Sequence, residues 1–197
     1  VAYMQSAFQQ RVQHGLDRLK PETLWPHYRR RVEKLDKVFG RAAVNLRTYD
    51  PRRFVDGDVA SDFAIWIGVE PPSSPPTRAN DSLSLEATAL LFTQRKFERR
   101  AVSGASSDMR ANARFVAALR RIWTRKLRFA PRLVGPVIDA HHDDLQWIEA
   151  RLGEQLLDDA AESGAMLRSE ADLLAVAEQN RDQLERVLAE EIGADID

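Results

Sequence analysis

Residues 42–50, AAVNLRTYD, decide the fold class of this chain because they are its one strand-like stretch. Val44, Leu46 and Thr48 alternate with more polar neighbours, and a glycine and a proline bound the stretch. Alternation with a period of two between turn-forming residues predicts a β-strand over 44–49. A lone strand cannot satisfy its own backbone hydrogen bonds. Since no other stretch is a good partner, we expect the partner to come from a part of the fold outside this sequence or from another chain.

The sequence on both sides of this strand predicts helices. Apolar residues recur every three or four positions in 3–19, and the same spacing marks the stretch that ends at Gly40. Ser82 or Ser84 is the expected N-cap of a later helix. Other expected helices lie over 56–68 and 108–129, and two acidic ones follow residue 137. The prediction is a mostly α-helical chain with one clear strand.

Composition excludes several classes of protein. The chain has 197 residues, of which 44% are apolar, and this suits a folded protein with a core. It contains no cysteine, so disulfides, thiolate nucleophiles and cysteine-bound metals are excluded. The sequence has no run of about 18 apolar residues and no signal-peptide pattern. We expect a cytoplasmic protein without a transmembrane segment.

Charge separates the chain into two parts. Residues 139–197 hold 17 Asp and Glu against 4 Lys and Arg, whereas residues 1–138 hold 25 Lys and Arg against 13 Asp and Glu. A basic body attracts anionic ligands, and an acidic helical face is usually solvated. We therefore expect residues 1–136 to form the body of the domain. Residues 137–197 are expected to form an acidic helical tail that packs on the body or on a partner.

The stretch 108–129 carries a stripe of arginines at helical spacing. They are Arg110, Arg114, Arg121, Arg125 and Arg128. Such a stripe can hold an acidic saccharide or nucleic-acid phosphates, and it is also typical of the solvated face of an amphipathic helix. We do not expect nucleic acid, because no recognition motif accompanies the stripe. This stretch, or the acidic tail, gives an alternative function as a non-catalytic helical module that binds a partner.

The four histidines do not predict a metal site. His141 and His142 are adjacent and point about 100° apart on a helix, so they cannot easily share a metal ion. His14 and His27 are candidate general bases, and the sequence does not choose between them. We expect no metal cofactor and assign no catalytic residue.

A series of short motifs runs through the chain in a fixed order. The segment QSAFQQR at 5–11 is followed by FG at 39–40, VNLRTYD at 44–50, GDVASDF at 57–63 and RANDSLS at 78–84. This order resembles the second half of bacterial sulfotransferase-like proteins, with S-x-[YF]-x-[QN]-R, [FG]-G, V-R-x-[YF]-D, G-D-[IV]-x-x-D-F and R-x-N-x-S-L-S in succession. The resemblance covers about residues 3–92. In addition, DDLQWIEARLG at 143–153 is similar to the later D-N-x-W-L-x-x-R-F-G segment of that family.

The resemblance implies an intact fold that is α/β with a parallel sheet, and 3'-phosphoadenosine 5'-phosphosulfate as the sulfuryl donor. The acceptor would be a saccharide or another hydroxyl compound. In the family, an arginine at a strand end and a serine at the start of the next helix hold the 3'-phosphate, and Ser6 matches that serine. Helix N-termini suit phosphate because their free N–H groups point at the anion. Arg78 and Asn80 are the further expected donor- or acceptor-binding residues, and helix capping alone would also explain Asn80.

The family's 5'-phosphosulfate loop is glycine-rich, and this sequence has no counterpart of it. Its nine glycines lie at 15, 40, 57, 68, 104, 135, 153, 164 and 193 and are never clustered. The arginine that would accompany Ser6 would precede Val1. The resemblance therefore implies the C-terminal portion of such an enzyme, beginning inside the 3'-phosphate motif and lacking the loop that catalysis needs.

Overall fold

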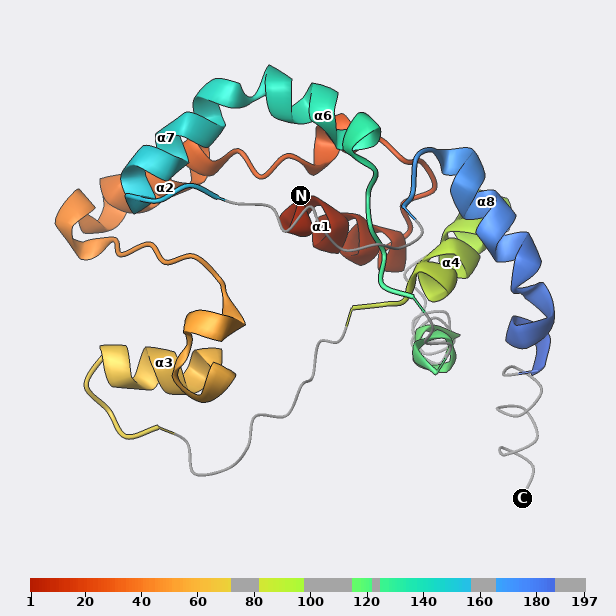
Figure 1. Ribbon diagram of the computed structural model, residues 1–197, viewed down its shortest axis with the longest axis horizontal. Coiled ribbons are helices and arrows are strands. Elements are labelled where there is room, and N and C mark those ends of the chain that lie inside the picture. The colour runs from red at the N-terminus through yellow and green to blue at the C-terminus, as the bar shows by residue number, and fades with distance from the viewer. Residues whose placement is uncertain (72–81, 98–114, 122–124, 157–165, 187–197) are drawn as a thin grey trace. The chain divides into compact units, whose positions relative to one another are not determined.

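The computed structural model describes residues 1–71, 82–97, 115–121, 125–156 and 166–186. The chain divides into two compact units. Unit 1 comprises Val1–Pro26, Ser82–His142 and Asp158–Asp197, and unit 2 comprises His27–Asp81 and Asp143–Leu157. Nearly all regular structure of the described residues is helical (Figure 1). The prediction of a mostly α-helical chain is confirmed.

Unit 1 is built around α4 (Leu85–Phe97), which packs on α1 (Ala2–Gln13) and on α8 (Glu170–Gln179). Figure 1 shows α8 alongside α4. Every residue of α4 from Leu85 to Phe92 is buried. A helix that is covered on all sides needs no polar stripe, which explains the nearly continuous apolar run in this segment.

The core of unit 1 lies where α1 meets α4. The ring centroid of Phe8 is 6.0 Å from that of Phe92 and 5.8 Å from that of Phe129. Gln9 is also buried, and its Nε2 donates a hydrogen bond of 2.6 Å to the carbonyl oxygen of Leu83. Such a partner is needed because an unpaired buried amide costs about 1–3 kcal/mol.

Local signals set the ends of several unit 1 helices. Ser84 begins α4, since its Oγ accepts a hydrogen bond of 3.0 Å from the N–H of Ala87. Ser169 begins α8 in the same way, accepting from the N–H of Asp172. Pro131 is the first residue of α6 (Pro131–Ala140), where its missing N–H costs nothing, and α6 packs on the short 3-10 helix η1 (Pro21–Leu24).

In unit 2, α2 (Tyr28–Phe39) and α7 (His142–Leu152) lie side by side and run in the same direction (Figure 1). Asp144, in the first turn of α7, accepts hydrogen bonds of 2.9 Å from the N–H groups of both Tyr28 and Arg29. Arg151, in the last turn of α7, donates to Asp36 at 3.3 Å. The two helices are therefore joined at both ends by polar contacts.

The rest of unit 2 is a chain of short turns leading to α3 (Val59–Trp66). The turns are η2 (Arg41–Ala43), η3 (Pro51–Arg53) and η4 (Val55–Gly57). Asp58 begins α3, because its Oδ2 accepts a hydrogen bond of 2.8 Å from the N–H of Ser61. The motif segment 57–63 thus contains the start signal of this helix.

Unit 2 buries little apolar surface and exposes much. Its buried hydrophobic residues among those described are Val32, Ala64 and Ile148. Its exposed large hydrophobic residues are Leu35, Val38, Phe39, Tyr49, Val55, Val59, Phe63, Ile65, Trp66, Ile67 and Val69. By contrast, Tyr3 and Phe97 are the exposed large hydrophobic residues described in unit 1. An apolar surface of this extent is typical of a face that another element covers.

The expectation of a strand over 44–49 is wrong for the described chain. The backbone is extended at Val44 (φ −95°, ψ 102°) and at Asp50 (φ −136°, ψ 104°), so the local conformation follows the alternation. The segment forms no ladder, however, and the described residues contain only the isolated bridges Ser84–Lys126 and Phe129–Leu167. The physical reason is that a strand needs a pairing partner, and none of the described segments forms backbone bridges with this one.

The expected helix over 108–129 is also corrected. Residues 108–114 and 122–124 lie outside the described residues, 115–120 are helical, and 125–130 are extended. Leu85 donates to the carbonyl of Arg125 at 2.7 Å, and Leu167 donates to that of Arg128 at 2.7 Å. These backbone hydrogen bonds hold residues 125–128 in a non-helical conformation, so Arg125 and Arg128 do not continue a helical stripe. The domain boundary expected after residue 136 stays a prediction.

Candidate functional site

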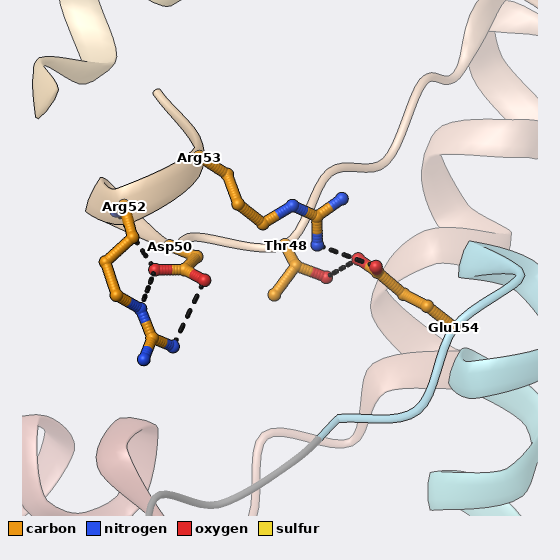
Figure 2. A network of polar contacts seen from close by, with 5 residues as sticks. All are labelled: Thr48, Asp50, Arg52, Arg53 and Glu154. Atoms are coloured by element: carbon orange, nitrogen blue, oxygen red, sulfur yellow. Dashed lines mark hydrogen bonds and ion pairs between the residues drawn. The ribbon is translucent and has the colours of Figure 1, made fainter. Parts of the chain in front are cut away.

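A group of charged side chains surrounds a hollow of about 300 Å³ in unit 2. The hollow is lined by Leu46, Arg47, Thr48, Arg53, Phe54, Leu152, Gly153 and Glu154. Its walls come from the extended segment 44–50, from the turn η3 and from the end of α7. We call Thr48, Asp50, Arg52, Arg53 and Glu154 the arginine–glutamate cluster; Figure 2 shows these five residues.

Glu154 is the centre of the cluster. Its Oε2 accepts a hydrogen bond of 2.7 Å from Nη1 of Arg53, and its Oε1 accepts one from the hydroxyl of Thr48 (Figure 2). Gly153 directs it there by ending α7 with φ +76°, a left-handed conformation that favours glycine. The sequence Gly-Glu after the helix thus turns the chain so that the carboxylate meets a segment about 100 residues earlier.

Asp50 and Arg52 form the second half of the cluster. Asp50 accepts hydrogen bonds from the Arg52 backbone N–H at 3.1 Å, from its Nε at 3.0 Å and from its Nη2 at 3.2 Å (Figure 2). The first of these caps η3, whose first residue is Pro51. Asp50 therefore fixes the turn that carries Arg53 to Glu154.

Arg47 connects the hollow to α3. Its guanidinium pairs with both carboxylate oxygens of Asp62, a buried residue of that helix. Burying a carboxylate is costly unless a partner compensates its charge, and Arg47 supplies that compensation. The Arg47 side chain is nevertheless 47% exposed, so it is also accessible to solvent.

Hydrogen bonding keeps the two carboxylates of the cluster ionised. The Thr48 hydroxyl and then the Arg53 guanidinium lower the pKa of Glu154. The Arg52 side chain and backbone lower the pKa of Asp50. Donors that stabilise the charged form of an acid lower its pKa. Glu154 is therefore suited to accept a hydrogen bond from a hydroxyl group and is a weak proton acceptor at neutral pH.

Of the site residues expected from the sequence, the structure describes Ser6, which is not part of this cluster. Ser6 belongs to unit 1, where it is an exposed residue in the second turn of α1. The free N–H groups of a helix belong to its first four residues, which precede Ser6. Arg78 and Asn80 lie outside the described residues. The phosphate-binding roles of these three residues stay predictions.

Sequence reasoning missed Glu154, Thr48 and Arg53 as a group. Thr48 lies inside the motif VNLRTYD, whereas Glu154 directly follows the segment DDLQWIEARLG and belongs to none of the motifs. The sequence does not predict the hydrogen bond between Thr48 and Glu154, which are 106 positions apart. The glycine before Glu154 is the one local signal, since it predicts a helix end there.

The described residues hold no group of three or more His, Asp or Glu placed to bind a metal ion. In the same residues, no helix is long and apolar enough to cross a membrane. Comparison of the chain with protein-family models, with curated proteins and with solved structures finds no match.

Proposed function

We propose that this chain is part of a cytoplasmic sulfotransferase-like enzyme. It transfers a sulfuryl group from 3'-phosphoadenosine 5'-phosphosulfate to a saccharide or another hydroxyl acceptor. The observation that carries the proposal is the arrangement of Glu154 with the Thr48 hydroxyl and the Arg53 guanidinium beside a hollow of about 300 Å³. Thr48, one of the three residues, lies on the segment that matches the V-R-x-[YF]-D motif of the resemblance.

Sulfuryl transfer needs the functional groups that this hollow contains. The sulfur–oxygen bond to the nucleotide phosphate breaks, a new sulfur–oxygen bond to the acceptor oxygen forms, and the acceptor proton passes to a general base or to water. A carboxylate that accepts a hydrogen bond from a hydroxyl can orient such an acceptor, as Glu154 does with Thr48. Guanidinium groups stabilise the negative charge on the sulfuryl oxygens and the leaving phosphate, and Arg47 and Arg53 line the hollow.

The unpaired segment 44–50 also supports the proposal. Its backbone is extended at Val44 and Asp50, and the segment forms no ladder with the described residues. The neighbouring α3 exposes Phe63, Ile65 and Trp66. In an α/β enzyme, an extended segment of this kind joins a sheet and an apolar helix covers the sheet's face. The phosphosulfate loop would come from a part of the enzyme outside this sequence.

Nucleotide binding tests the proposal. The protein at its natural length is titrated calorimetrically with adenosine 3',5'-bisphosphate, the product of the donor, and with adenosine 5'-phosphate. We expect tighter binding of the bisphosphate, because only this nucleotide carries the 3'-phosphate assigned to Ser6. Equal affinity for the two nucleotides, or binding of neither, would contradict the proposal.

A non-catalytic helical module that binds a partner is the second candidate. The distribution of glycines favours this second candidate. The nine glycines of the sequence are never clustered, so the sequence contains no glycine-rich phosphosulfate loop. Such a module would bind neither nucleotide in the titration above. The same experiment therefore separates the two candidates.

A further inference from the structure

One face of α2 carries three cations without acidic partners. Arg30, Lys34 and Lys37 are exposed and form no ion pair or hydrogen bond with the described residues. We call them the α2 cation stripe. In the same unit, Arg47 pairs with Asp62 and Arg53 pairs with Glu154. The positive charge of the α2 cation stripe is therefore not neutralised by ion pairs with the described carboxylates of unit 2.

The helix places the three cations in one line. Steps of four and three residues keep them within an arc of about 60° and spread them over about 10 Å along the helix axis. Arg29 is not counted in the stripe, since it pairs with Glu33 at 2.7 Å and lies 6.0 Å from the ring centroid of Trp147 on α7. The stripe thus presents positive charges at intervals of about one helical turn, which matches a linear ligand with repeated anionic groups.

The stripe borders an open hollow of about 490 Å³. The hollow is lined by His27, Arg29, Arg30, Glu33, Lys34, Lys37 and Asp144. All of these residues are charged or histidine, and the apolar part of the lining comes from the carbon stems of their side chains. The lining includes no Phe, Tyr or Trp on which nucleic-acid bases could stack.

A carboxylate in the same hollow narrows the chemistry of the ligand. Glu33 accepts a hydrogen bond from Nε of Arg29 through Oε1, and its Oε2 accepts none from the described residues. An ionised carboxylate oxygen accepts hydrogen bonds and donates none. A matching ligand therefore brings hydroxyl donors for Glu33 as well as anionic groups for the cations. Acidic saccharides carry both at every sugar unit or two.

We propose that the α2 cation stripe binds a linear acidic saccharide, whose anionic groups are carboxylates or sulfates. Arg30, Lys34 and Lys37 contact successive anionic groups, and Glu33 accepts a hydrogen bond from a sugar hydroxyl between them. The surface is inferred from α2 itself. Only the further role of this saccharide as the acceptor of sulfuryl transfer rests on the proposed function.

Binding measurements with matched charge variants test the proposal. The chain is titrated with an oligogalacturonate, which carries carboxylates, and with a heparin oligosaccharide, which carries sulfates as well. A stripe variant combines Arg30→Gln, Lys34→Gln and Lys37→Gln. A control variant combines Lys20→Gln, Lys126→Gln and Arg132→Gln, which removes three exposed cations from unit 1. Thermal unfolding of both variants checks that they remain folded.

We expect the stripe variant to bind at least one of the two saccharides about tenfold to a hundredfold more weakly, and the control variant to bind as the parent chain does. If the stripe variant loses affinity only for the oligogalacturonate, the recognised groups are carboxylates. If it loses affinity only for the heparin oligosaccharide, they are sulfates. An equal loss in both variants, or no saccharide binding by the parent chain, would overturn the proposal. Tighter binding of oligothymidylate or of phosphatidylglycerol vesicles than of either saccharide would also overturn it. None of these readouts requires sulfuryl transfer, so failure of the proposed function leaves the result interpretable.

Discussion

The charge of the Glu154 side chain is set by two donors that come from an extended segment and a tight turn. Thr48 donates through its hydroxyl and Arg53 through its guanidinium at 2.7 Å. Both donors favour the ionised carboxylate, so the pKa of Glu154 in the folded protein lies below its usual value of about 4.3. A group of this kind stabilises the fold above its unfolded pKa, and that contribution is lost as pH falls through the folded pKa.

Replacing Thr48 by valine tests this account of Glu154. We expect Thr48→Val to raise the pKa of Glu154 towards the usual value, because the largest contribution to the shift comes from the Thr48 hydroxyl. Carbon-13 NMR titration of the Glu154 carboxyl measures the change. Thr48→Ser keeps the hydroxyl and serves as the control. Equal pKa values in the two variants would show that the hydroxyl does not hold the carboxylate.

Ser6 gives a second prediction at this scale. In the protein at its natural length, Ser6→Ala is expected to bind adenosine 3',5'-bisphosphate about tenfold more weakly, because one hydrogen bond to a charged phosphate is lost. Ser6→Thr retains a hydroxyl and is expected to bind nearly as tightly as the unsubstituted protein. Since Ser6 is exposed, neither change should unfold α1. Unchanged affinity in Ser6→Ala would contradict the proposed role of Ser6 in nucleotide binding.

At the scale of the element, α2 depends on a cap that it does not supply itself. Its preceding residue, His27, makes no side-chain capping hydrogen bond. Asp144 of α7 instead accepts from the first two N–H groups of α2 at 2.9 Å each. A carboxylate at this position satisfies two free donors and interacts favourably with the helix dipole. The parallel arrangement of α2 and α7 therefore has a specific polar cause.

Removal of this cap is expected to destabilise the start of α2 by about 1 kcal/mol. The variant is Asp144→Ala, and hydrogen exchange of the Tyr28 and Arg29 amides measures the loss of protection. Asp143→Ala is the matched control, because Asp143 also lies in the first turn of α7 but is exposed. Equal effects of the two substitutions would mean that the dipole of α7, and not the cap of α2, carries the contribution.

The extended segment 44–50 gives the next prediction for an element. Its amides are expected to exchange with solvent at nearly unprotected rates in this 197-residue chain, because the segment forms no ladder among the described residues. Amide hydrogen exchange at Leu46, Arg47 and Thr48 measures this, and the buried amide of Leu91 in α4 is the protected reference. Strong protection at Leu46 to Thr48 would mean that the segment is paired.

At the scale of the whole molecule, the two units differ in what holds them together. Unit 1 has an aromatic core around Phe8, whose side chain is completely buried, whereas Phe39 of unit 2 is 65% exposed. We expect Phe8→Ala to lower the free energy of unfolding of unit 1 by about 3–5 kcal/mol. The matched change Phe39→Ala is expected to have little effect. Urea unfolding of the two variants measures both, and a large effect of Phe39→Ala would contradict the difference.

The sequence predicts the elements of this chain better than it predicts their contacts. Helical spacing and Ser84 locate α1, α2 and α4 because these signals are local. The alternation in 44–49 agrees with the extended backbone at Val44, but it wrongly predicts a strand, because pairing depends on a second segment that local spacing does not describe. The helix expected to continue to residue 129 stops earlier because contacts with α4 and Leu167 hold the chain extended. For the same reason, Glu154 and Thr48 could not be joined from sequence alone.

Sulfuryl transfer is the measurement that tests the central claim most directly. The protein at its natural length is incubated with sulfur-35-labelled 3'-phosphoadenosine 5'-phosphosulfate and a panel of saccharides, and label in the saccharide is counted. We predict labelled saccharide with the unsubstituted protein. We also predict transfer at least about tenfold slower with Glu154→Gln, because the amide loses the charge that orients the acceptor hydroxyl. Asp143→Asn, an exposed acid-to-amide change on α7, should transfer at the unsubstituted rate. Absence of label in every acceptor, or full transfer by Glu154→Gln, would contradict the assignment of this site.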